Sequence, residues 1–393
     1  MTKEKFSFRL SGTDGAARLG QITTPHGTAQ TPIFMPVATQ ATVKGLTFDE
    51  VRNAGAETVL SNAYHLYLRP GVDRIRDAGG LHRFMGWAGP VLTDSGGYQA
   101  FSLGALRRIN DNGILFRSHI DGSEHLFTPE VAIRNQQLFG ADIIMCFDQC
   151  VFSAGDRSDV RAAMDRTHRW ARVCYDTHAP TAYSGVQALF GIVQGGTIPE
   201  FRDESTELVT SIPFDGYAIG GLAVGETKEE MHRITRQVCE GLPSDKPRYL
   251  MGVGSPEDLV NGVALGVDMF DCVLPTRVAR NGALFTPTGR INIANRRYGD
   301  QDVPLDETCD CYACQHYSAA YLRHLFKAGE MLGPRMASVH NLRFVLRLME
   351  QMRDAIAGGR FVEFRDRFLG AYQPTDEQSR QTQKHRWIRE RGV

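Results

Sequence analysis

Eight short apolar runs, each followed by a longer stretch with helical periodicity, constrain the fold of this chain more than any other feature. They cover residues 32–37, 58–62, 90–94, 142–148, 188–194, 216–221, 248–252 and 268–271. Residues 159–178 and 228–241 show the spacing of apolar side chains that is typical of amphipathic helices. Eight strand–helix alternations predict an α/β protein built as a TIM (β/α)8 barrel, and disfavour an open doubly wound sheet.

The regions outside the barrel differ in composition. Residues 1–30 predict an N-terminal β-hairpin region, and residues 31–275 the main part of the catalytic barrel. Residues 276–345 are interpreted as an insertion that carries an arginine-rich stretch and a cysteine cluster, and residues 346–393 as C-terminal helices, one of them over 341–358, and a polar tail. Between residues 272 and 299 there is no Asp or Glu but there are five arginines, which indicates a phosphate-facing patch.

The sequence carries no sign of secretion or of membrane insertion. No apolar run approaches the roughly 18 residues that a membrane span needs, and the first ten residues contain charges but no continuous apolar segment. We therefore expect a cytoplasmic protein. Five of the eight cysteines are scattered in apolar surroundings, as reduced thiols are, whereas three are clustered.

The clustered cysteines predict a metal site. Cys309, Cys311 and Cys314 have the spacing C-x-C-x2-C, and His340 follows after a helical stretch. Three thiolates and one imidazole form a normal tetrahedral set for structural Zn²⁺. Because four protein ligands leave no position for water, we expect one structural zinc ion per chain with no catalytic role.

Polar or backbone-exposing residues stand where five of the apolar runs end: Asp94, Asp148, Gln194, Gly221 and Asp271. Barrel enzymes gather their chemistry at the C-terminal ends of the strands, so these positions should converge on one mouth. Each position alone has a plain explanation, since Asp and Gly commonly start loops. Five together favour a site.

The last strand offers two adjacent candidate nucleophiles, Asp271 and Cys272. Neighbouring strand residues point to opposite faces, so only one can face the mouth. A cysteine nucleophile would need a histidine partner, whereas a carboxylate suits attack on the anomeric carbon of a sugar. Asp94 would then handle the proton of the leaving base, and Asp148 and Gln194 could bind the edge of a purine. The residues thus indicate a base-handling glycosyl transferase.

Several long motifs resemble one family. They read TDSGGYQAFSL, FRSHIDGS, GADIIMCFD, QALFGIVQGG, GYAIGGLAVGE, PRYLMGVGSPEDLV, FDCVLPTR and CDCYAC. These runs resemble bacterial tRNA-guanine transglycosylase (queuine tRNA-ribosyltransferase) from about residue 6 to about residue 370. The resemblance implies a TIM barrel with a zinc subdomain, a homodimer, and exchange of the wobble guanine (position 34) of tRNAs for Asp, Asn, His and Tyr. The incoming base would be preQ1, a 7-deazaguanine, on the way to queuosine.

The resemblance also implies roles for individual residues. Asp271 resembles the nucleophile that forms a covalent RNA intermediate, and Asp94 the general acid/base. The residues expected to bind the base are Asp94, Ser95, Gly96, Gly97, Tyr98, Asp148, Gln194, Gly221 and Leu222. Those expected to contact RNA are Gly252, Val253, Gly254, Ser255, Pro256, Glu257, Asp258, Thr276, Arg277, Val278, Ala279 and Arg280. The resemblance implies the same zinc ligands, Cys309, Cys311, Cys314 and His340.

One departure and three alternatives bear on function. After Asp148 the family usually has Glu-Cys and a proline-stiffened loop, whereas this chain has Gln149-Cys150-Val-Phe-Ser-Ala. The base preference is therefore open between preQ1, favoured by the bulk of Cys150 and Val224, and direct use of queuine. A non-catalytic RNA-binding partner subunit is disfavoured by the retained carboxylates. A retaining glycoside hydrolase is disfavoured by the arginines and by the lack of tryptophans near the strand ends.

Overall fold

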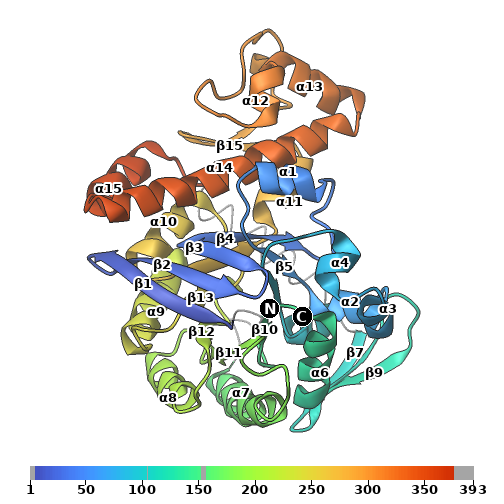
Figure 1. The fold of residues 1–393 in the computed structure, drawn as a ribbon. Helices are drawn as coiled ribbons and strands as arrows, with labels where there is room; N and C mark the ends of the chain where they lie inside the picture. The colour runs from blue at the N-terminus through green and yellow to red at the C-terminus, as the bar shows by residue number, and fades with distance from the viewer. Residues whose placement is uncertain (1–4, 104, 152–155, 376–393) are drawn as a thin grey trace.

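The computed structural model describes residues 5–103, 105–151 and 156–375, and its centre is a closed barrel of eight parallel strands (Figure 1). In chain order these strands are β4 (Ile33–Ala38), β5 (Val59–Ser61), β6 (Val91–Thr93), β10 (Ile143–Met145), β11 (Ala188–Val193), β12 (Gly216–Ile219), β13 (Arg248–Leu250) and β14 (Met269–Cys272). Each lies in one of the eight apolar runs or within a residue of it. The barrel closes where β14 pairs with β4, so the predicted TIM barrel is confirmed.

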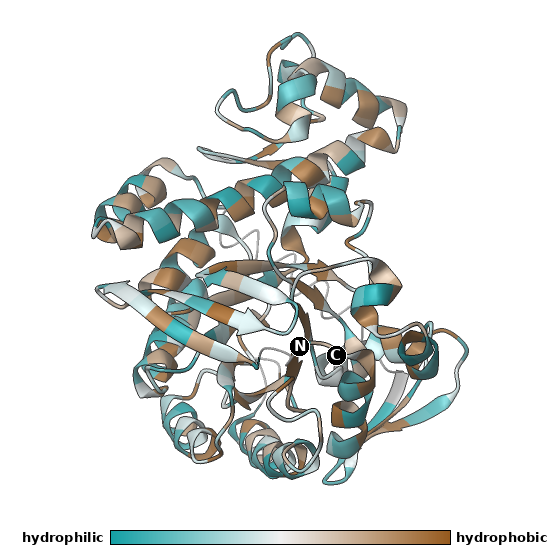
Figure 2. Ribbon diagram, viewed as in Figure 1, coloured by the Kyte–Doolittle hydropathy of each residue, from teal (hydrophilic) through white to brown (hydrophobic). Residues whose placement is uncertain are grey.

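Alternation of side chains along the strands divides the core into two layers. One layer fills the barrel interior, with Met35, Phe190, Tyr249 and Met269 among its buried members. The other lies between strands and helices and includes Phe270, the neighbour of Met269. Figure 2 shows that apolar residues gather on the barrel strands, whereas the surrounding helices carry many hydrophilic residues.

In the described part of the chain, eleven helices connect the barrel strands or directly follow the last of them. They are α1 (Phe48–Asn53), α2 (Ala63–Leu68), α3 (Val72–Asp77), α4 (Leu81–Met85), α5 (Gly97–Leu103), α6 (Pro129–Phe139), α7 (Arg157–His178), α8 (Pro199–Thr210), α9 (Lys228–Gly241), α10 (Pro256–Ala264) and α11 (Leu274–Arg280). Local sequence defines several of their starts. At α9, for example, Thr227 and Glu230 form a capping box that satisfies exposed backbone N–H groups of the first turn.

The N-terminal region is a three-stranded antiparallel sheet of β1 (Ser7–Asp14), β2 (Ala17–Thr24) and β3 (Gly27–Thr31). The expected hairpin is therefore present and is extended by a third strand. Ile22 and Ala29 are buried against the interior layer of the barrel, and the ring of Phe6 contacts that of Phe190. The sheet thus closes one end of the barrel and leaves the other end as the mouth (Figure 1).

A second antiparallel sheet, which the sequence did not predict, follows α5. Its strands are β7 (Ala105–Asn110), β8 (Gly113–Arg117) and β9 (Glu124–Phe127). Its short strands are interrupted by polar residues, so they lack the long apolar runs that identified the barrel strands. Phe116 and Phe127 are completely buried and pack on Tyr64 of α2, which fixes this sheet to the barrel.

The segment after α11 projects from the barrel (Figure 1). It contains β15 (Ala283–Thr286), β16 (Gly289–Asn292), the 3-10 helix η1 (Arg296–Tyr298), α12 (Tyr312–His316), α13 (Ala319–Ala328), α14 (Leu332–Ala357) and α15 (Phe361–Ala371). The helix expected over residues 341–358 begins earlier, at Leu332, and is continuous across residue 345. It contacts both the barrel, through α11 and β4, and the projecting helices α12 and α13. Most of the polar tail, residues 376–393, lies outside the described residues.

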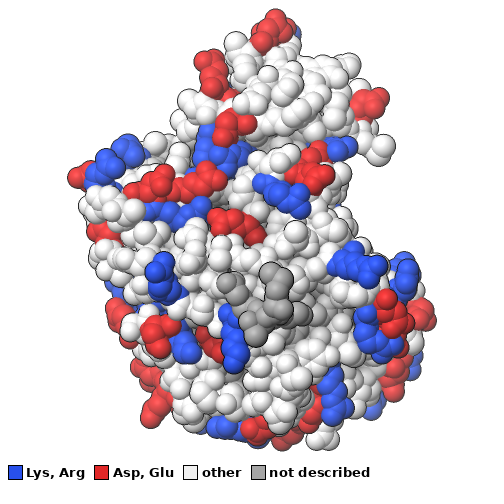
Figure 3. Space-filling view, in the orientation of Figure 1, with Lys and Arg blue, Asp and Glu red and all other residues white. Residues whose placement is uncertain are grey.

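The surface carries both signs of charge. On the face drawn in Figure 3, acidic and basic side chains are interspersed over the barrel and the projecting segment. No helix in the described ranges combines the length and the apolar character needed to cross a membrane.

Candidate active site and metal centre

Asp271 lies at the C-terminal end of β14 and points into the barrel mouth. The Tyr249 hydroxyl donates to its Oδ1 over 2.5 Å, and the N–H of Gly252 donates to the same oxygen over 2.8 Å. Burial raises the pKa of Asp271, while these two donors favour its ionised form and oppose that shift. Cys272 points the other way, since a Cβ on Gly254 would lie 2.3 Å from the Cβ of Cys272. Of the two adjacent candidates, the carboxylate therefore faces the mouth.

Asp94 follows β6 and faces the same space. The side-chain amide of Asn62 donates to its Oδ2 over 2.5 Å, and the N–H of Ala63 to its Oδ1 over 2.8 Å. Burial raises the pKa of Asp94 to about 7, and the negative charge of Asp271 adds to the increase. The two carboxyl groups are 177 residues apart in sequence, but both lie at the C-terminal ends of strands of one closed parallel barrel and therefore face the same mouth. A carboxyl group that titrates near neutral pH can both give and take a proton.

Asp148 and Gln194 form a buried pair beside these carboxyl groups. The Gln194 side-chain amide donates to Oδ2 of Asp148 over 2.7 Å. Burial raises the pKa of Asp148 to about 6, although hydrogen bonds from Gln194 and Ser95 favour the ionised form. The pair presents acceptors and a donor at one wall of the mouth, as the edge of a purine requires.

The glycines near Asp94 bring parts of the backbone together. A Cβ on Gly97 would lie 2.7 Å from the carbonyl oxygen of Asp148, and Gly96 has a φ of +79°. These glycines are among the residues that the resemblance assigns to base binding, and they also allow two segments of the protein's own backbone to approach each other. Tyr98 follows in α5 and is partly buried. Gly221 also allows a close approach: a Cβ added to this residue would lie only 2.3 Å from Oε1 of Gln194.

The turn after Gly221 contains a buried carboxylate that the sequence did not single out. Glu226 accepts the N–H groups of Ala223, Val224 and Gly225. Ala223 has a φ of +57°, in the left-handed region that costs a non-glycine residue free energy. The carboxylate thus holds a strained turn directly beside Leu222, which lines the core below the mouth.

The two stretches expected to contact RNA differ in exposure. In the first, only Gly252 is exposed, while Val253, Gly254, Pro256, Glu257 and Asp258 are buried and Ser255 is partly exposed. Lys228 pairs with both Glu257 and Asp258, so these acids are occupied within the protein. In the second, Thr276 and Ala279 are buried, Val278 and Arg280 are partly exposed, and Arg277 is exposed.

The five arginines after β14 have no ion-pair partner among the described residues: Arg277, Arg280, Arg290, Arg296 and Arg297. One guanidinium nitrogen of Arg280 is buried and forms no hydrogen bond there. Burial and the charge of Arg277 lower the pKa of Arg280. Of the five, Arg277 and Arg280 lie on α11 directly after β14, and guanidinium groups without an acidic partner are suited to an anionic ligand such as a phosphate.

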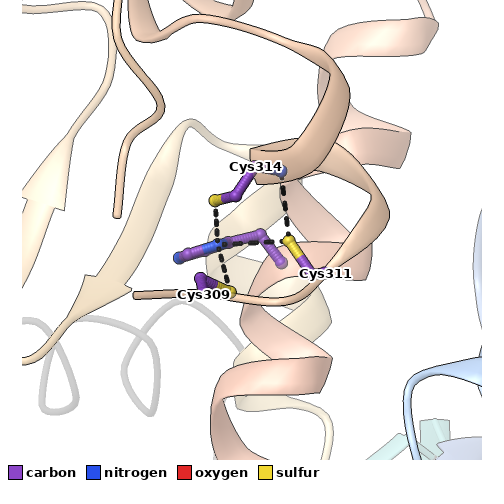
Figure 4. A group of neighbouring side chains, drawn as sticks. Cys309, Cys311 and Cys314 are labelled. Atoms are coloured by element: carbon purple, nitrogen blue, oxygen red, sulfur yellow. Dashed lines mark hydrogen bonds between the residues drawn. The ribbon is translucent and has the colours of Figure 1, made fainter. Parts of the chain in front are cut away.

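The clustered cysteines and His340 form a buried group of four donors between α12 and α14 (Figure 4). Nδ1 of His340 lies 3.7, 3.6 and 3.3 Å from the sulfurs of Cys309, Cys311 and Cys314. Tetrahedral Zn²⁺ would place sulfur and nitrogen ligands about 3.6 Å apart, given their usual bond lengths. Nε2 of His340 lies 2.7 Å from the carbonyl oxygen of Phe285, which directs Nδ1 at the sulfurs. The group can hold a metal and is compatible with zinc.

Four residues that organise the site were missed from the sequence: Asn62, Arg202, Glu226 and Tyr249. Arg202 is completely buried and donates to the carbonyl oxygens of Val193, Gly196 and Gly220, behind Gln194 and Gly221. Only Tyr249 carried a usable signal, because a tyrosine in a buried barrel strand needs a partner for its hydroxyl group. The others act through contacts between segments distant in sequence.

Comparison with known proteins agrees with the resemblance seen in the motifs. The family model described as queuine tRNA-ribosyltransferase matches residues 13–374. A protein of that name from Herpetosiphon aurantiacus is 55% identical over 368 residues, which cover 94% of this chain and 93% of that protein. One from Pelotomaculum thermopropionicum is 54% identical, covering 94% and 98%, and one from Dehalococcoides mccartyi is 50% identical, covering 98% and 97%.

Proposed function

This chain belongs to the queuine tRNA-ribosyltransferase family of pentosyltransferases, and we propose that it exchanges the wobble guanine (position 34) of G-U-N anticodon tRNAs for preQ1 through a covalent aspartyl–ribosyl RNA intermediate. The exchange would take place in the cytoplasm as a step of queuosine biosynthesis. The observation that carries the proposal is that Asp94 and Asp271 lie at the C-terminal ends of two strands of one barrel, where burial and the charge of Asp271 raise the pKa of Asp94 to about 7.

In the first half of the reaction, Oδ2 of Asp271 attacks C1′ of the ribose. The bond from C1′ to the base nitrogen breaks, and its electron pair goes to the departing guanine. Protonated Asp94 supplies the proton that this base needs. In the second half, preQ1 gives a proton to ionised Asp94 and its nitrogen attacks C1′, which releases Asp271. Both bases would use one pocket, which predicts ping-pong kinetics.

The pocket for the base is proposed to be formed by the side chains of Asp148 and Gln194 and the backbone of Gly221 and Leu222. The hydrogen bond between Asp148 and Gln194 keeps both polar groups satisfied until the edge of a base replaces or shares it. Ser95, Gly96, Gly97 and Tyr98 would line the pocket between Asp94 and Asp148, because Ser95 hydrogen-bonds to Asp148 and Gly97 lies against its carbonyl oxygen.

The tRNA is proposed to lie across the exposed part of α11. Arg277 and Arg280 are the expected phosphate ligands, because they lie directly after the nucleophile and have no acidic partner in the described ranges. Gly252 is the exposed position of the other stretch. The buried residues of the same stretch would support that contact by fixing the loop; they are Val253, Gly254, Pro256, Glu257 and Asp258.

The clustered cysteines and His340 are proposed to hold one structural zinc ion. A bound ion would supply a tetrahedral crosslink between α12 and α14 and would leave no coordination position for a substrate. The fit rests on the sulfur–nitrogen separations and on the hydrogen bond that orients His340.

We propose a homodimer formed through the projecting segment. Tyr312 and Tyr321 are exposed, and with Tyr317, His316 and His324 they form a continuous set of ring contacts on α12 and α13. Met331 nearby has 88% of its surface exposed. Aromatic residues and methionine on an open surface are typical of protein interfaces.

The preference for preQ1 rests on pocket size. Cys150 and Val224 are both buried, so their bulk would limit the substituent on the deazapurine. Gln149 accepts a hydrogen bond from Arg166, and the next loop, residues 152–155, lies outside the described residues. Direct use of queuine is the second candidate.

The deciding experiment uses unmodified tRNA that carries labelled guanine at position 34. Wild type should release the label only in the presence of an incoming base, with preQ1 competing better than queuine. An RNA-linked protein should appear on a denaturing gel. Absence of both release and linkage would instead identify a non-catalytic RNA-binding partner subunit.

A further inference from the structure

A second cluster of potential metal ligands lies at the end of the barrel opposite the mouth. His26 belongs to the turn between β2 and β3, His82 to α4, and Asp142 directly precedes β10. Nδ1 of His26 lies 2.7 Å from Oδ1 of Asp142, and Nε2 of His82 lies 3.0 Å from Oδ2. The donor atoms of the three residues all lie within 4.8 Å of one another. None of them takes part in the proposed exchange reaction.

Asp142 is a buried carboxylate without a permanent cationic partner. Its residue is 2% exposed, and it also accepts the N–H of Val91 over 2.8 Å. No Lys or Arg in the described part of the chain pairs with it. Burial opposes ionisation, but hydrogen bonds with His26 and His82 hold the pKa of Asp142 below its ordinary value. An ionised carboxylate at this depth needs a compensating positive charge.

The two imidazole rings offer nitrogen donors at the same place. They are stacked, with centroids 3.5 Å apart and an angle of 16° between the rings. Imidazole nitrogens are common ligands of divalent transition-metal ions. The side chain of His26 is 36% exposed and that of His82 12%, which opens a path from solvent to the carboxylate.

We propose that His26, His82 and Asp142 form a second metal site, for a divalent ion of the zinc and cobalt class. Nitrogen and oxygen ligands of one such ion lie about 2.9–3.4 Å apart for bond angles between 90° and tetrahedral. The separation of 3.0 Å at His82 already lies in this range, whereas the 2.7 Å at His26 must expand by a few tenths of an ångström, together with a rotation of the His26 ring. The ion replaces protons on the ligating nitrogens, and water completes its coordination.

The position of this site predicts its role. His26 belongs to the N-terminal sheet, whereas Asp142 and Val91 lie at the beginnings of the barrel strands β10 and β6. An ion held by both would join the sheet to the barrel without contact with the mouth. Binding should therefore stabilise the native state and leave base exchange unchanged.

The test starts from protein whose cysteine site is already filled with zinc, and titrates it with Co²⁺. Wild type should bind one further ion per chain. Its visible spectrum should show weak d–d bands without the intense sulfur-to-cobalt absorption that would report exchange at the cysteine site. His82→Ala and His26→Ala should each weaken this binding at least about tenfold. His125→Ala, which removes a partly exposed histidine of β9, should bind like wild type.

Thermal unfolding provides the second measurement. Co²⁺ should raise the unfolding temperature of wild type and of His125→Ala, but not that of His82→Ala. Because His26 lies on an exposed turn, His26→Ala should fold even if His82→Ala does not, and it should show the same loss. The proposal is wrong if wild type takes up no second ion at saturating Co²⁺, or if all three variants bind it equally.

Discussion

The hydroxyl oxygen of Tyr249 lies 2.5 Å from Oδ1 of Asp271, the same oxygen that accepts the N–H of Gly252. Within the described residues Oδ2 of Asp271 accepts no hydrogen bond. One oxygen is thus held and the other remains available to bond a ribose carbon. In the proposed reaction Tyr249 would be a positioning residue, because its hydrogen bond favours the ionised form of Asp271 that attack would require.

Replacing Tyr249 by Phe should slow formation of the covalent intermediate by roughly 10-fold or more at neutral pH, since a charge-assisted hydrogen bond contributes about 1.5–3 kcal/mol. Loss of the donor should raise the pKa of Asp271, so the defect should shrink as pH rises. Single-turnover rates across pH would measure this. Tyr217→Phe is the matched control, because that buried hydroxyl donates to the carbonyl of Ile212 outside the barrel. A defect in Tyr249→Phe that is independent of pH would contradict the assigned role.

Asp271→Asn should abolish the RNA-linked protein and reduce base exchange at least about 10³-fold, because an amide is a poor nucleophile. Cys272→Ala is the informative comparison, since the neighbouring side chain points away from the mouth and its loss should leave the rate near that of wild type. Denaturing gels and labelled-guanine exchange would score both variants. A reversed outcome would assign the chemistry to the thiol.

Release of guanine should depend on pH through Asp94, whose pKa is raised to about 7. The acid must be protonated to give a proton to the leaving base, so the single-turnover release rate should be constant below that value and fall as pH rises above it. Attack by preQ1 requires ionised Asp94 and should show the opposite trend. In Asp94→Asn both limbs should disappear along with most of the rate. Profiles of the two half-reactions with the same slope would exclude this assignment.

Removal of one cysteine ligand should release the metal and loosen the projecting segment. Cys314→Ser is expected to lower the bound zinc from one ion per chain to none. It should also destabilise the native state by roughly 3 kcal/mol or more, a fraction of the binding free energy of structural zinc. Metal analysis and chemical denaturation would measure both effects. Cys272→Ala should keep its zinc, and equal zinc contents in the two variants would show that the cysteine cluster is not the site.

Arg277→Ala should weaken tRNA binding and lower the slope of log affinity against log salt concentration by about 1, as expected for one lost phosphate contact. Arg172→Ala on α7 is the control, because that exposed arginine lies near Asp176 and away from the mouth. Binding isotherms at several salt concentrations would compare them. An unchanged slope for Arg277→Ala would place the phosphate backbone elsewhere.

Some features followed from the sequence because they depend on local order. The eight apolar runs identified the barrel strands, since a strand buried on both faces must be apolar along its length. The alternation of side chains settled that Asp271 and Cys272 face opposite ways, and the spacing of Cys309, Cys311 and Cys314 indicated a metal site. These patterns are carried by residues close together in the chain.

Only the tertiary structure decided how the site is held. The pairing of Tyr249 with Asp271 and of Asn62 with Asp94 joins residues 22 and 32 positions apart. Two further arrangements form only when the barrel closes, because they join segments that are distant in sequence. One is the pairing of Glu257 and Asp258 with Lys228, and the other is the contact of His26 and His82 with Asp142. Hydrogen bonds and pKa values reflect three-dimensional distance and burial, and periodicity along a chain encodes neither.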